Sequence, residues 1–457
     1  MGQLSFNEFG AVSKTDWTSQ ANKDLKGKDF SETLLWKTNE NFTIEPFYSE
    51  EDLQSLPLAE MQSAQNTKIN QGWHNRPIIK FSSEKETNTL IISALQKGAN
   101  GVIIDLSKTS IAQISLVKLL DNVKLSDAPI VFRTNGEATV LIKELAKFIN
   151  YQMKGGIQDD ALGTWMQTGN WNSQAWENAK ELIIATKDSP AFRPLTISSH
   201  HFHQAGANAT QELGFLLSST CTYLDALTDL GIEIDEIFSK TEFSVSIGTN
   251  YFLEIAKIRA LRVLLVKLYQ TFVDNNKVLP KIYVDAQMST FFDAAITINT
   301  NILRETTEAM AAAVGGCDSL SVHAHNAVAG QDDEFSERIA RNISVLMKEE
   351  SHLDKSTDAA AGSYYIEQLT YKLTQAAWDL FLKVEEMGGI KQAFDNGFVQ
   401  SEIKQSYERQ VAQLQNGKVM VGVNKFRIDE QEFVKQEASV GNDNLLIPRR
   451  LSESFEI

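Results

Sequence analysis

Five of the seven histidines in this 457-residue sequence fall in two short segments. Imidazole is the side chain best suited to move protons or bind metals near neutral pH. The first segment holds His200, His201 and His203, and the second holds His323 and His325. If both segments are extended, His201 shares a side with His203, and His323 with His325, so the rings could converge on a metal ion. The alternative is that they are hydrogen-bonded polar residues that fill the end of a barrel.

A metal-dependent hydrolase would also need a carboxylate ligand at a neighbouring strand end. The candidates are Asp105, Asp159, Asp160 and Asp285. The sequence contains no GxGxxG after a strand, no GxxxxGK[ST], no GxSxG and no HExxH. The glycine pair at 155–156 could admit a ligand close to the backbone, but we favour a turn at a strand end. We therefore expect no metal site.

Short apolar runs bounded by turn residues predict eight β-strands. They cover residues 76–81, 101–106, 128–134, 151–157, 193–199, 243–247, 281–287 and 319–323. Helical stretches alternate with them, of which 251–272 is the clearest, and glycine pairs at 315–316 and 388–389 are typical of helix ends. Eight such units predict an α/β fold, a (β/α)8 TIM barrel, with an open doubly wound sheet as the alternative. The strand ends would then position the histidines on one face.

The flanking segments do not join this alternation. We expect an N-terminal arm over residues 1–70, a barrel over 71–400, and a C-terminal helix and extended tail over 401–457. The arm carries eight aromatic residues that should be buried somewhere, either on this chain's own barrel or against a partner subunit. They are Phe6, Phe9, Trp17, Phe30, Trp36, Phe42, Phe47 and Tyr48.

Charge and composition exclude several classes of protein. Forty-three Lys and Arg residues against 59 Asp and Glu give a net charge of −16, which disfavours nucleic acid and membrane surfaces. Cys221 and Cys317 lie far apart and outside any CxxC pattern, which predicts no disulfide and a reducing compartment. The sequence shows no signal peptide and no apolar run of about 18 residues. We expect a cytoplasmic protein.

Several blocks of the sequence are more specific. ISSHHFHQAGANATQELGFLLSS (197–219), GTNYFLEIAKIRALR (248–262) and ETTEAMAAAVGGCDSL (305–320) resemble the methylmalonyl-CoA mutase family, as do further blocks from DLKGKDF (24–30) to GVNKFRI (422–428). This resemblance implies a coenzyme-B12 isomerase barrel, in which an acyl-CoA ester threads the barrel and a second domain carries the cobalamin.

The sequence departs from the family pattern where substrate should be contacted. His200 stands at the tyrosine of the family's Tyr-His pair, His201 is retained, and His203 replaces the following glutamine. His323 stands at an asparagine of the eighth-strand loop, and Gln287 matches a family glutamine. The RGPY-type motif and the cobalt-binding DxHxxG have no counterpart.

We interpret these departures as those of the family's non-catalytic small subunit, which pairs with a catalytic large subunit as a heterodimer. We expect no catalytic residues, no cofactor bound by this chain alone, adenosylcobalamin in the partner, and a CoA ester only through the partner. The vestigial pocket would comprise His200, His201, His203, Gln287 and His323. One alternative is a split enzyme, in which this barrel is catalytic and a separate protein supplies cobalamin. The other is the metal-dependent hydrolase.

Overall fold

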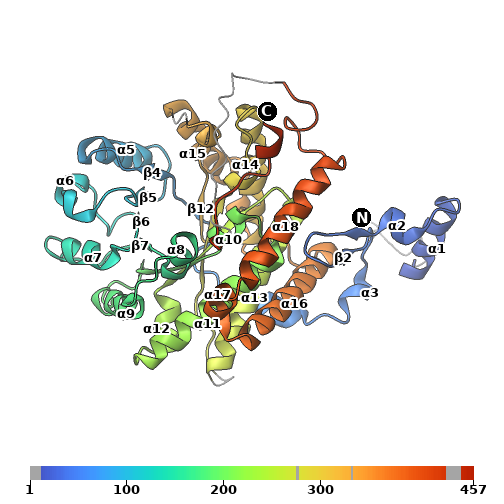
Figure 1. The fold of residues 1–457 in the computed structure, drawn as a ribbon, viewed down its shortest axis with the longest axis horizontal. Coiled ribbons are helices and arrows are strands. Elements are labelled where there is room, and N and C mark those ends of the chain that lie inside the picture. Colours follow the sequence, from blue (N-terminus) through green and yellow to red (C-terminus); the bar gives the residue numbers. More distant parts are fainter. Residues whose placement is uncertain (1–11, 274–276, 331–332, 429–443, 457) are drawn as a thin grey trace, which may run out of the picture.

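Parallel β-strands alternate with α-helices through most of the computed structural model, which describes residues 12–273, 277–330, 333–428 and 444–456 (Figure 1). The strands are β3 (His74–Asn75), β4 (Ile78–Lys80), β5 (Val102–Asp105), β6 (Ile130–Arg133), β7 (Gly155–Gln158), β8 (Phe192–Arg193), β9 (Leu195–Ser198), β10 (Thr241–Ile247), β11 (Tyr283–Met288) and β12 (Ser319–Ser321). Each of the eight predicted strands overlaps at least one of these segments.

The strands pair in two five-stranded parallel sheets, in the orders β3-β12-β11-β10-β9 and β4-β5-β6-β7-β8. The chain passes directly from β3 to β4 at Pro77 and from β8 to β9 at Pro194. Proline has no N–H to donate to a ladder, so each break divides one strand into two segments. On one side of the first break, Arg76 N donates to Leu320 O (2.9 Å), and on the other Ile103 N donates to Pro77 O (3.0 Å). The strand order therefore returns to its start, as in the predicted TIM barrel.

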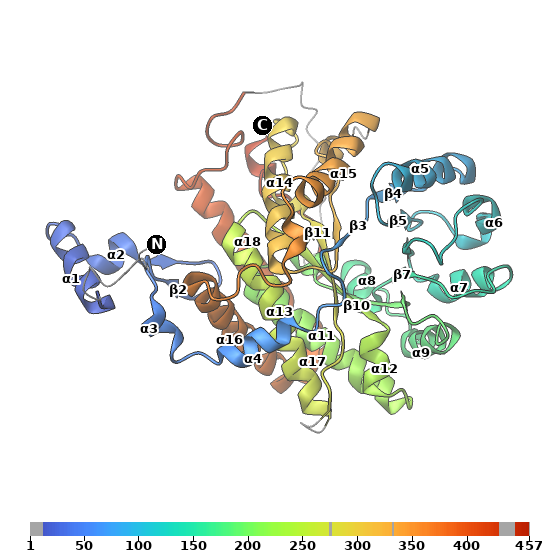
Figure 2. The same ribbon diagram turned by 180° about the vertical axis from the view of Figure 1, so that it is seen from behind.

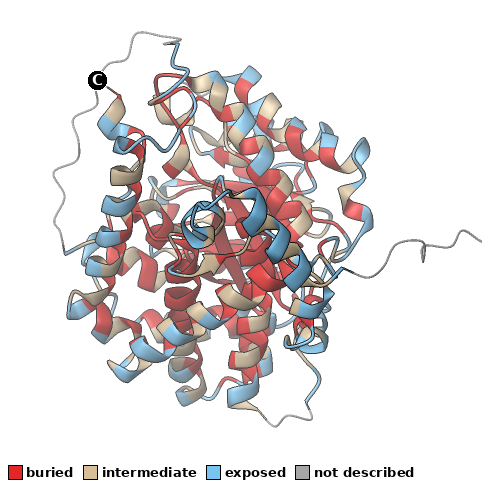
Figure 3. Ribbon diagram, turned by 90° about the vertical axis from the view of Figure 1, so that its right-hand side faces the viewer, coloured by how far each residue is buried: buried red, intermediate tan, exposed pale blue. Residues whose placement is uncertain are grey.

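Helices cover the outside of the strands (Figures 1 and 2). They are α5 (Glu84–Gln96), α6 (Leu116–Leu119), α7 (Ala138–Ala146), α8 (Ala161–Thr168), α9 (Ala175–Ala185), α10 (His200–Ala205), α11 (Ala209–Asp229), α12 (Ile234–Ser239), α13 (Tyr251–Phe272), α14 (Ile298–Gly315), α15 (Glu334–Glu349), α16 (Tyr364–Glu386), α17 (Gly389–Asp395) and α18 (Phe398–Gln415). Short 3-10 turns are η1 (Ile111–Gln113), η2 (Thr290–Phe292), η3 (Ala327–Ala329), η4 (Leu353–Lys355) and η5 (Glu453–Phe455). The core lies between the strands and α11, α13 and α14, where buried residues are concentrated (Figure 3).

The predicted helix ends are confirmed at two glycines. Gly316 ends α14 with a φ of 89°, and Gly388 follows α16 with a φ of 97°. Both values lie in the left-handed region, which glycine adopts without a steric penalty. The glycine pair at 155–156 lies at the start of β7, where a Cβ atom on Gly155 would be 1.9 Å from Ile130 O. Close strand packing therefore requires glycine there, and the predicted turn at a strand end is wrong.

The N-terminal segment has two parts that differ in burial. Helices α1 (Lys14–Asp24) and α2 (Phe30–Leu34) contain no buried residue and stand away from the barrel (Figures 1 and 2). The hairpin of β1 (Trp36–Lys37) and β2 (Thr43–Ile44) and the helices α3 (Glu50–Leu53) and α4 (Leu58–Gln65) follow. Ile44 and Tyr48 belong to the main hydrophobic core. Of the aromatic side chains in this second part, Tyr48 is buried and Phe42 packs against the core, whereas Trp36 and Phe47 are exposed. Phe6 and Phe9 lie outside the described residues.

The described part of the C-terminal tail is packed rather than loosely attached. Arg449 N donates to Gln204 O (2.7 Å), and Leu451 N donates to Phe291 O (2.8 Å). Leu451 and Ser452 are buried. Residues 449–452 therefore cross the face at which β9 and β11 end.

Candidate functional site

Charged side chains meet on the axis of the barrel. Arg76, between β3 and β4, binds Glu242 of β10 through Nη1 to Oε2 (2.8 Å) and Nη2 to Oε1 (3.0 Å). Its Nη2 also lies 2.6 Å from Asp285 Oδ1 on β11. The strands of Arg76 and Glu242 are not neighbours in the sheet order, so their side chains can meet only inside the barrel. All three side chains are at most 3% exposed.

Amide side chains and a second arginine extend this ionic cluster. Gln158 Nε2 donates to Glu242 Oε1 (2.9 Å), and Arg133 Nη2 donates to both Gln158 Oε1 and Gln287 Oε1 (2.9 Å each). Gln287 Nε2 donates to Asp285 Oδ2 (2.8 Å). The residues Arg76, Arg133, Gln158, Glu242, Asp285 and Gln287 are called the axial network below. Its side chains occupy the interior from the first strand to the seventh.

The axial network holds Asp285 in the charged form. Burial opposes ionisation of Asp285, but the Arg76 guanidinium and the hydrogen bonds from Gln287, Ser319 and Ser244 lower its pKa to about 2. Arg76 has a pKa raised well above its usual value, because Asp285 and Glu242 outweigh the effect of burial. Asp285 and Arg76 therefore both stay charged at neutral pH, as a buried and paired ionic contact.

Two of the five predicted pocket residues contact this network. Gln287 is a member, and His200 lies beside it, with Nε2 2.7 Å from Ser244 Oγ and Nδ1 2.7 Å from Ser246 Oγ. Burial lowers the pKa of His200 to about 4, so the imidazole is neutral near pH 7. Hydrogen bonds at both nitrogens hold this neutral ring in one orientation.

His201 and His203 do not share a side, contrary to the extended geometry expected from the sequence. Helix α10 begins at His200, directly after β9, and residues two apart in a helix point about 200° apart. His201 packs against Gly163, where a Cβ atom would be 2.8 Å from its Nδ1. Burial lowers the pKa of His201 to about 3.

His203 belongs to a different cluster, at the start of α11 and α13. Its Nδ1 is 2.7 Å from Glu212 Oε1, and Lys257 Nζ is 2.9 Å from the same oxygen and 2.7 Å from Glu254 Oε2. Burial opposes ionisation of Glu212, but Lys257 and His203 lower its pKa to about 2. His203, Glu212 and Glu254 line a cavity of about 330 Å³ between the barrel, the β1–β2 hairpin and α18.

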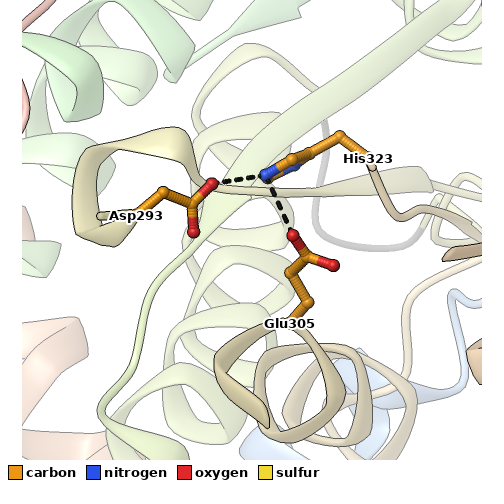
Figure 4. A group of neighbouring side chains, drawn as sticks. All are labelled: Asp293, Glu305 and His323. Atoms are coloured by element: carbon orange, nitrogen blue, oxygen red, sulfur yellow. Dashed lines mark hydrogen bonds and ion pairs between the residues drawn. The ribbon is translucent and has the colours of Figure 1, made fainter. Parts of the chain in front are cut away.

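His323 lies apart from the other four, in a third cluster. Its Nε2 is 2.7 Å from Asp293 Oδ2 and 3.4 Å from Glu305 Oε1 (Figure 4). Burial opposes protonation of His323, but Asp293 and Glu305 raise its pKa to about 10. The five predicted residues therefore have different hydrogen-bond partners, and the shared pocket stays a prediction.

The aspartates proposed as hydrolase ligands have other roles. Asp105 accepts hydrogen bonds from Ser107, and Asp159 accepts from Gly136 N and Thr134 Oγ1. Asp160 caps α8, and burial raises its pKa to about 6. Asp285 belongs to the axial network. None of the four joins a histidine in a group of three metal-ligating side chains within the described residues.

These clusters lie in the barrel of a chain whose sequence matches a known family over most of its length. The sequence model described as methylmalonyl-CoA mutase matches residues 108–447. The chain belongs to the methylmalonyl-CoA mutase family.

Relatives in the mutase family include small and large subunits. The chain is 34% identical to a methylmalonyl-CoA mutase small subunit of Porphyromonas gingivalis over 438 residues, which cover 92% of this chain and 71% of that protein. It is 28% identical to a small subunit of Streptomyces virginiae, with 96% and 73% covered. The large subunit of Porphyromonas gingivalis is 29% identical, with 87% of this chain and 61% of that subunit covered. This chain therefore spans less than two thirds of that large subunit.

The structure of a dihydropteroate synthase from Coxiella burnetii, solved in complex with pteroic acid, aligns with 69% of this chain and with 99% of its own chain. The TM-score is 0.33 and the sequence identity is 11%. Similarity at that level carries no argument. Over the residues that the structure describes, no helix combines the length and apolar character that a membrane span needs.

Most of the axial network of this mutase-family chain was missed at the level of sequence. The signal was present as polar residues at alternate positions of apolar strands: Glu242 and Ser244 among Phe243, Val245 and Ile247. Because alternate residues of a strand share one face, such a row marks a polar barrel interior. The acids Asp293 and Glu305 were also missed.

Proposed function

We propose that this chain is the non-catalytic small subunit of a coenzyme-B12-dependent methylmalonyl-CoA mutase, the enzyme that interconverts methylmalonyl-CoA and succinyl-CoA. It pairs with a catalytic large subunit as a heterodimer, and adenosylcobalamin belongs to that partner. The relatives named as small and large subunits support the pairing.

The axial network is the observation that carries this proposal. The family resemblance implies that an acyl-CoA ester threads the barrel, and here that space contains Arg76, Glu242 and Asp285 in direct contact. Admitting a ligand would require separating buried charges, and breaking such a pair typically costs about 3–5 kcal/mol. The barrel therefore acts as a rigid body in the complex rather than as a substrate channel.

The face at which the strands end also disfavours cofactor binding by this chain. Residues 449–452 cross it, with backbone hydrogen bonds to Gln204 and Phe291. Burial lowers the pKa of His200 and His201, which keeps both imidazoles neutral, and the sequence contains no DxHxxG histidine to bind cobalt.

The proposal is tested by reconstituting the chain with a catalytic large subunit, adenosylcobalamin and methylmalonyl-CoA. His201→Ala and Gln287→Ala should leave turnover per heterodimer within twofold of the wild type, because neither residue meets substrate. A hundredfold loss with the heterodimer intact would contradict the non-catalytic role.

A second arm tests the split enzyme. The chain is mixed with a separate cobalamin-binding protein and several acyl-CoA esters, without the large subunit. We expect no turnover. Turnover that disappears in His201→Ala would establish this barrel as catalytic.

A further inference from the structure

Three side chains from separate elements of the chain place potential metal-ligand atoms close together beside the ends of β11 and β12 (Figure 4). Asp293 follows η2, Glu305 lies on α14, and His323 follows β12. Asp293 Oδ2, Glu305 Oε1 and His323 Nε2 all lie within 4.8 Å of one another. No second group of three such side chains meets this limit within the described residues.

The cluster contains three carboxyl groups, those of Asp293, Glu305 and Glu308, within electrostatic reach of the His323 imidazole, and the Arg304 guanidinium lies within such reach of Asp293 and Glu308. Glu308 lies one turn along α14 from Glu305, and the two residues are 1% and 0% exposed. None of their four carboxylate oxygens has a hydrogen-bond partner among the described residues, and the same is true of Asp293 Oδ1. Buried carboxyl groups without hydrogen-bond partners require protons or a cation.

The spacing suits a metal ion. Bonds of about 2.0–2.2 Å in tetrahedral geometry place two ligand atoms about 3.4 Å apart. The separation of His323 Nε2 and Glu305 Oε1 is 3.4 Å, and that of Nε2 and Asp293 Oδ2 is 2.7 Å. A metal ion that replaces the proton between His323 and Asp293 therefore requires the distance from Nε2 to Oδ2 to increase by about 0.7 Å. Rotation of one carboxylate group can supply this increase.

Neighbouring groups hold the ligand-bearing loops in place. Asn301 Nδ2 donates to Ala294 O (3.0 Å) and to His325 O (2.9 Å), so one side chain joins the loop of Asp293 to that of His323. Ser452 Oγ donates to Asp293 O (2.7 Å). Metal sites in proteins typically rely on such supporting hydrogen bonds to orient their ligands.

We propose that Asp293, Glu305 and His323 bind one divalent transition-metal ion, such as Zn²⁺ or Mn²⁺, with Glu308 adding negative charge behind them. One imidazole with two carboxylates is a donor set suited to these ions. The ion would join the loop after η2, helix α14 and the loop after β12. Its role is structural.

Direct titration tests the site. The full chain is purified without a histidine tag, stripped with a chelator, and titrated with ZnCl₂ and separately with MnCl₂ by isothermal calorimetry. We expect one ion per chain with a Kd below about 10 μM for at least one of them, and a rise in melting temperature because the ion binds the folded state. Wild-type protein that binds neither ion at 1 mM would overturn the proposal.

Matched variants locate the binding. His323→Gln and Asp293→Asn should each raise the Kd at least tenfold, with far-UV circular dichroism confirming that they are folded. His352→Asn is the control, because it removes an exposed imidazole at a left-handed position (φ 53°) that asparagine tolerates. Equal affinity in all four proteins would place any bound ion elsewhere and refute this assignment.

Discussion

Arg76 and Asp285 face each other on the barrel axis, with Nη2 and Oδ1 2.6 Å apart and both side chains at most 1% exposed. They come from opposite ends of the barrel sequence, in the first and seventh strands. The first strand consists of two short segments, β3 and β4. The ion pair between Arg76 and Asp285 ties this strand to the later half of the chain. The axial network is thus a stability determinant as well as an obstacle to ligand.

Arg76→Met should destabilise the protein by about 3–5 kcal/mol, because it leaves Glu242 and Asp285 as buried, unbalanced carboxylates. Chemical denaturation followed by far-UV circular dichroism measures the change. Lys143→Met removes an exposed partner of Glu181 and should cost less than about 1 kcal/mol. Equal effects from the two substitutions would show that the axial charges are solvated.

Acid should weaken the fold through Asp285. Its pKa is about 2 in the folded protein and near 3.8 in the unfolded chain, so the folded state binds its proton less tightly. The stabilisation is fully present above the unfolded value and is lost as pH falls from about 4 to 2, with a total of about 2–3 kcal/mol. Denaturation midpoints measured across this range should fall in the wild type and fall less steeply in Asp285→Asn. Parallel curves would contradict the lowered pKa.

The outer part of the N-terminal segment should bind the partner subunit. Trp17 of α1 stacks on Phe47 with ring centroids 4.9 Å apart, and neither ring is buried in this chain. Trp17→Ala should weaken heterodimer formation at least tenfold by surface plasmon resonance, because large aromatic side chains dominate binding energy at interfaces. Phe148→Ala removes a comparably exposed ring at the end of α7 and should leave affinity unchanged.

Deleting residues 1–34 is a sharper form of the same test. The deletion stops before the hairpin, so it spares Ile44 and Tyr48 of the main core. Heterodimer formation should be lost while far-UV circular dichroism of the barrel is largely preserved. A deletion of residues 1–50 would remove core side chains as well, and could not separate folding from binding. Pairing that survives removal of residues 1–34 would refute the interface role.

Gly155→Ala should destabilise the barrel by about 3 kcal/mol or more. The new Cβ would lie 1.9 Å from Ile130 O, and the φ of 114° is strained for alanine. Gly136→Ala is the control, because its φ of 78° is also positive but no atom lies within 4 Å of its added Cβ. That substitution should cost only about 1–2 kcal/mol. Melting temperatures of the two variants provide the comparison.

Local patterns predicted the fold well where they were strong. The apolar stripe of α13 predicted its bounds, 251–272, and Gly316 marked the end of α14. The strand at 151–157 was displaced to Gly155–Gln158, because its first residues carry no alternation that would define the start. Burial of apolar faces determines these elements, and that information is local.

The site was predicted less well, because its contacts join distant segments. The run His200–His203 has no apolar period, so nothing in it distinguished a helix from an extended segment. Glu305 and Glu308 did leave a signal, since they lie three residues apart on an alanine-rich helix face. Their meeting with Asp293 and His323 depends on how three loops and helices pack, which no local pattern contains.

The hydrogen bonds between the C-terminal tail and the loop of Asp293 also set the order in which the barrel and the acidic cluster form during synthesis. Ser452 and Glu456 hold that loop through Asp293 O and Ala295 N, at 2.7 Å each. A ribosome makes these residues about 160 positions after the loop itself, long after the strands and helices of the barrel have emerged. The barrel can therefore assemble first, and the acidic cluster reaches its final geometry only when Ser452 and Glu456 have left the exit tunnel and reached the loop.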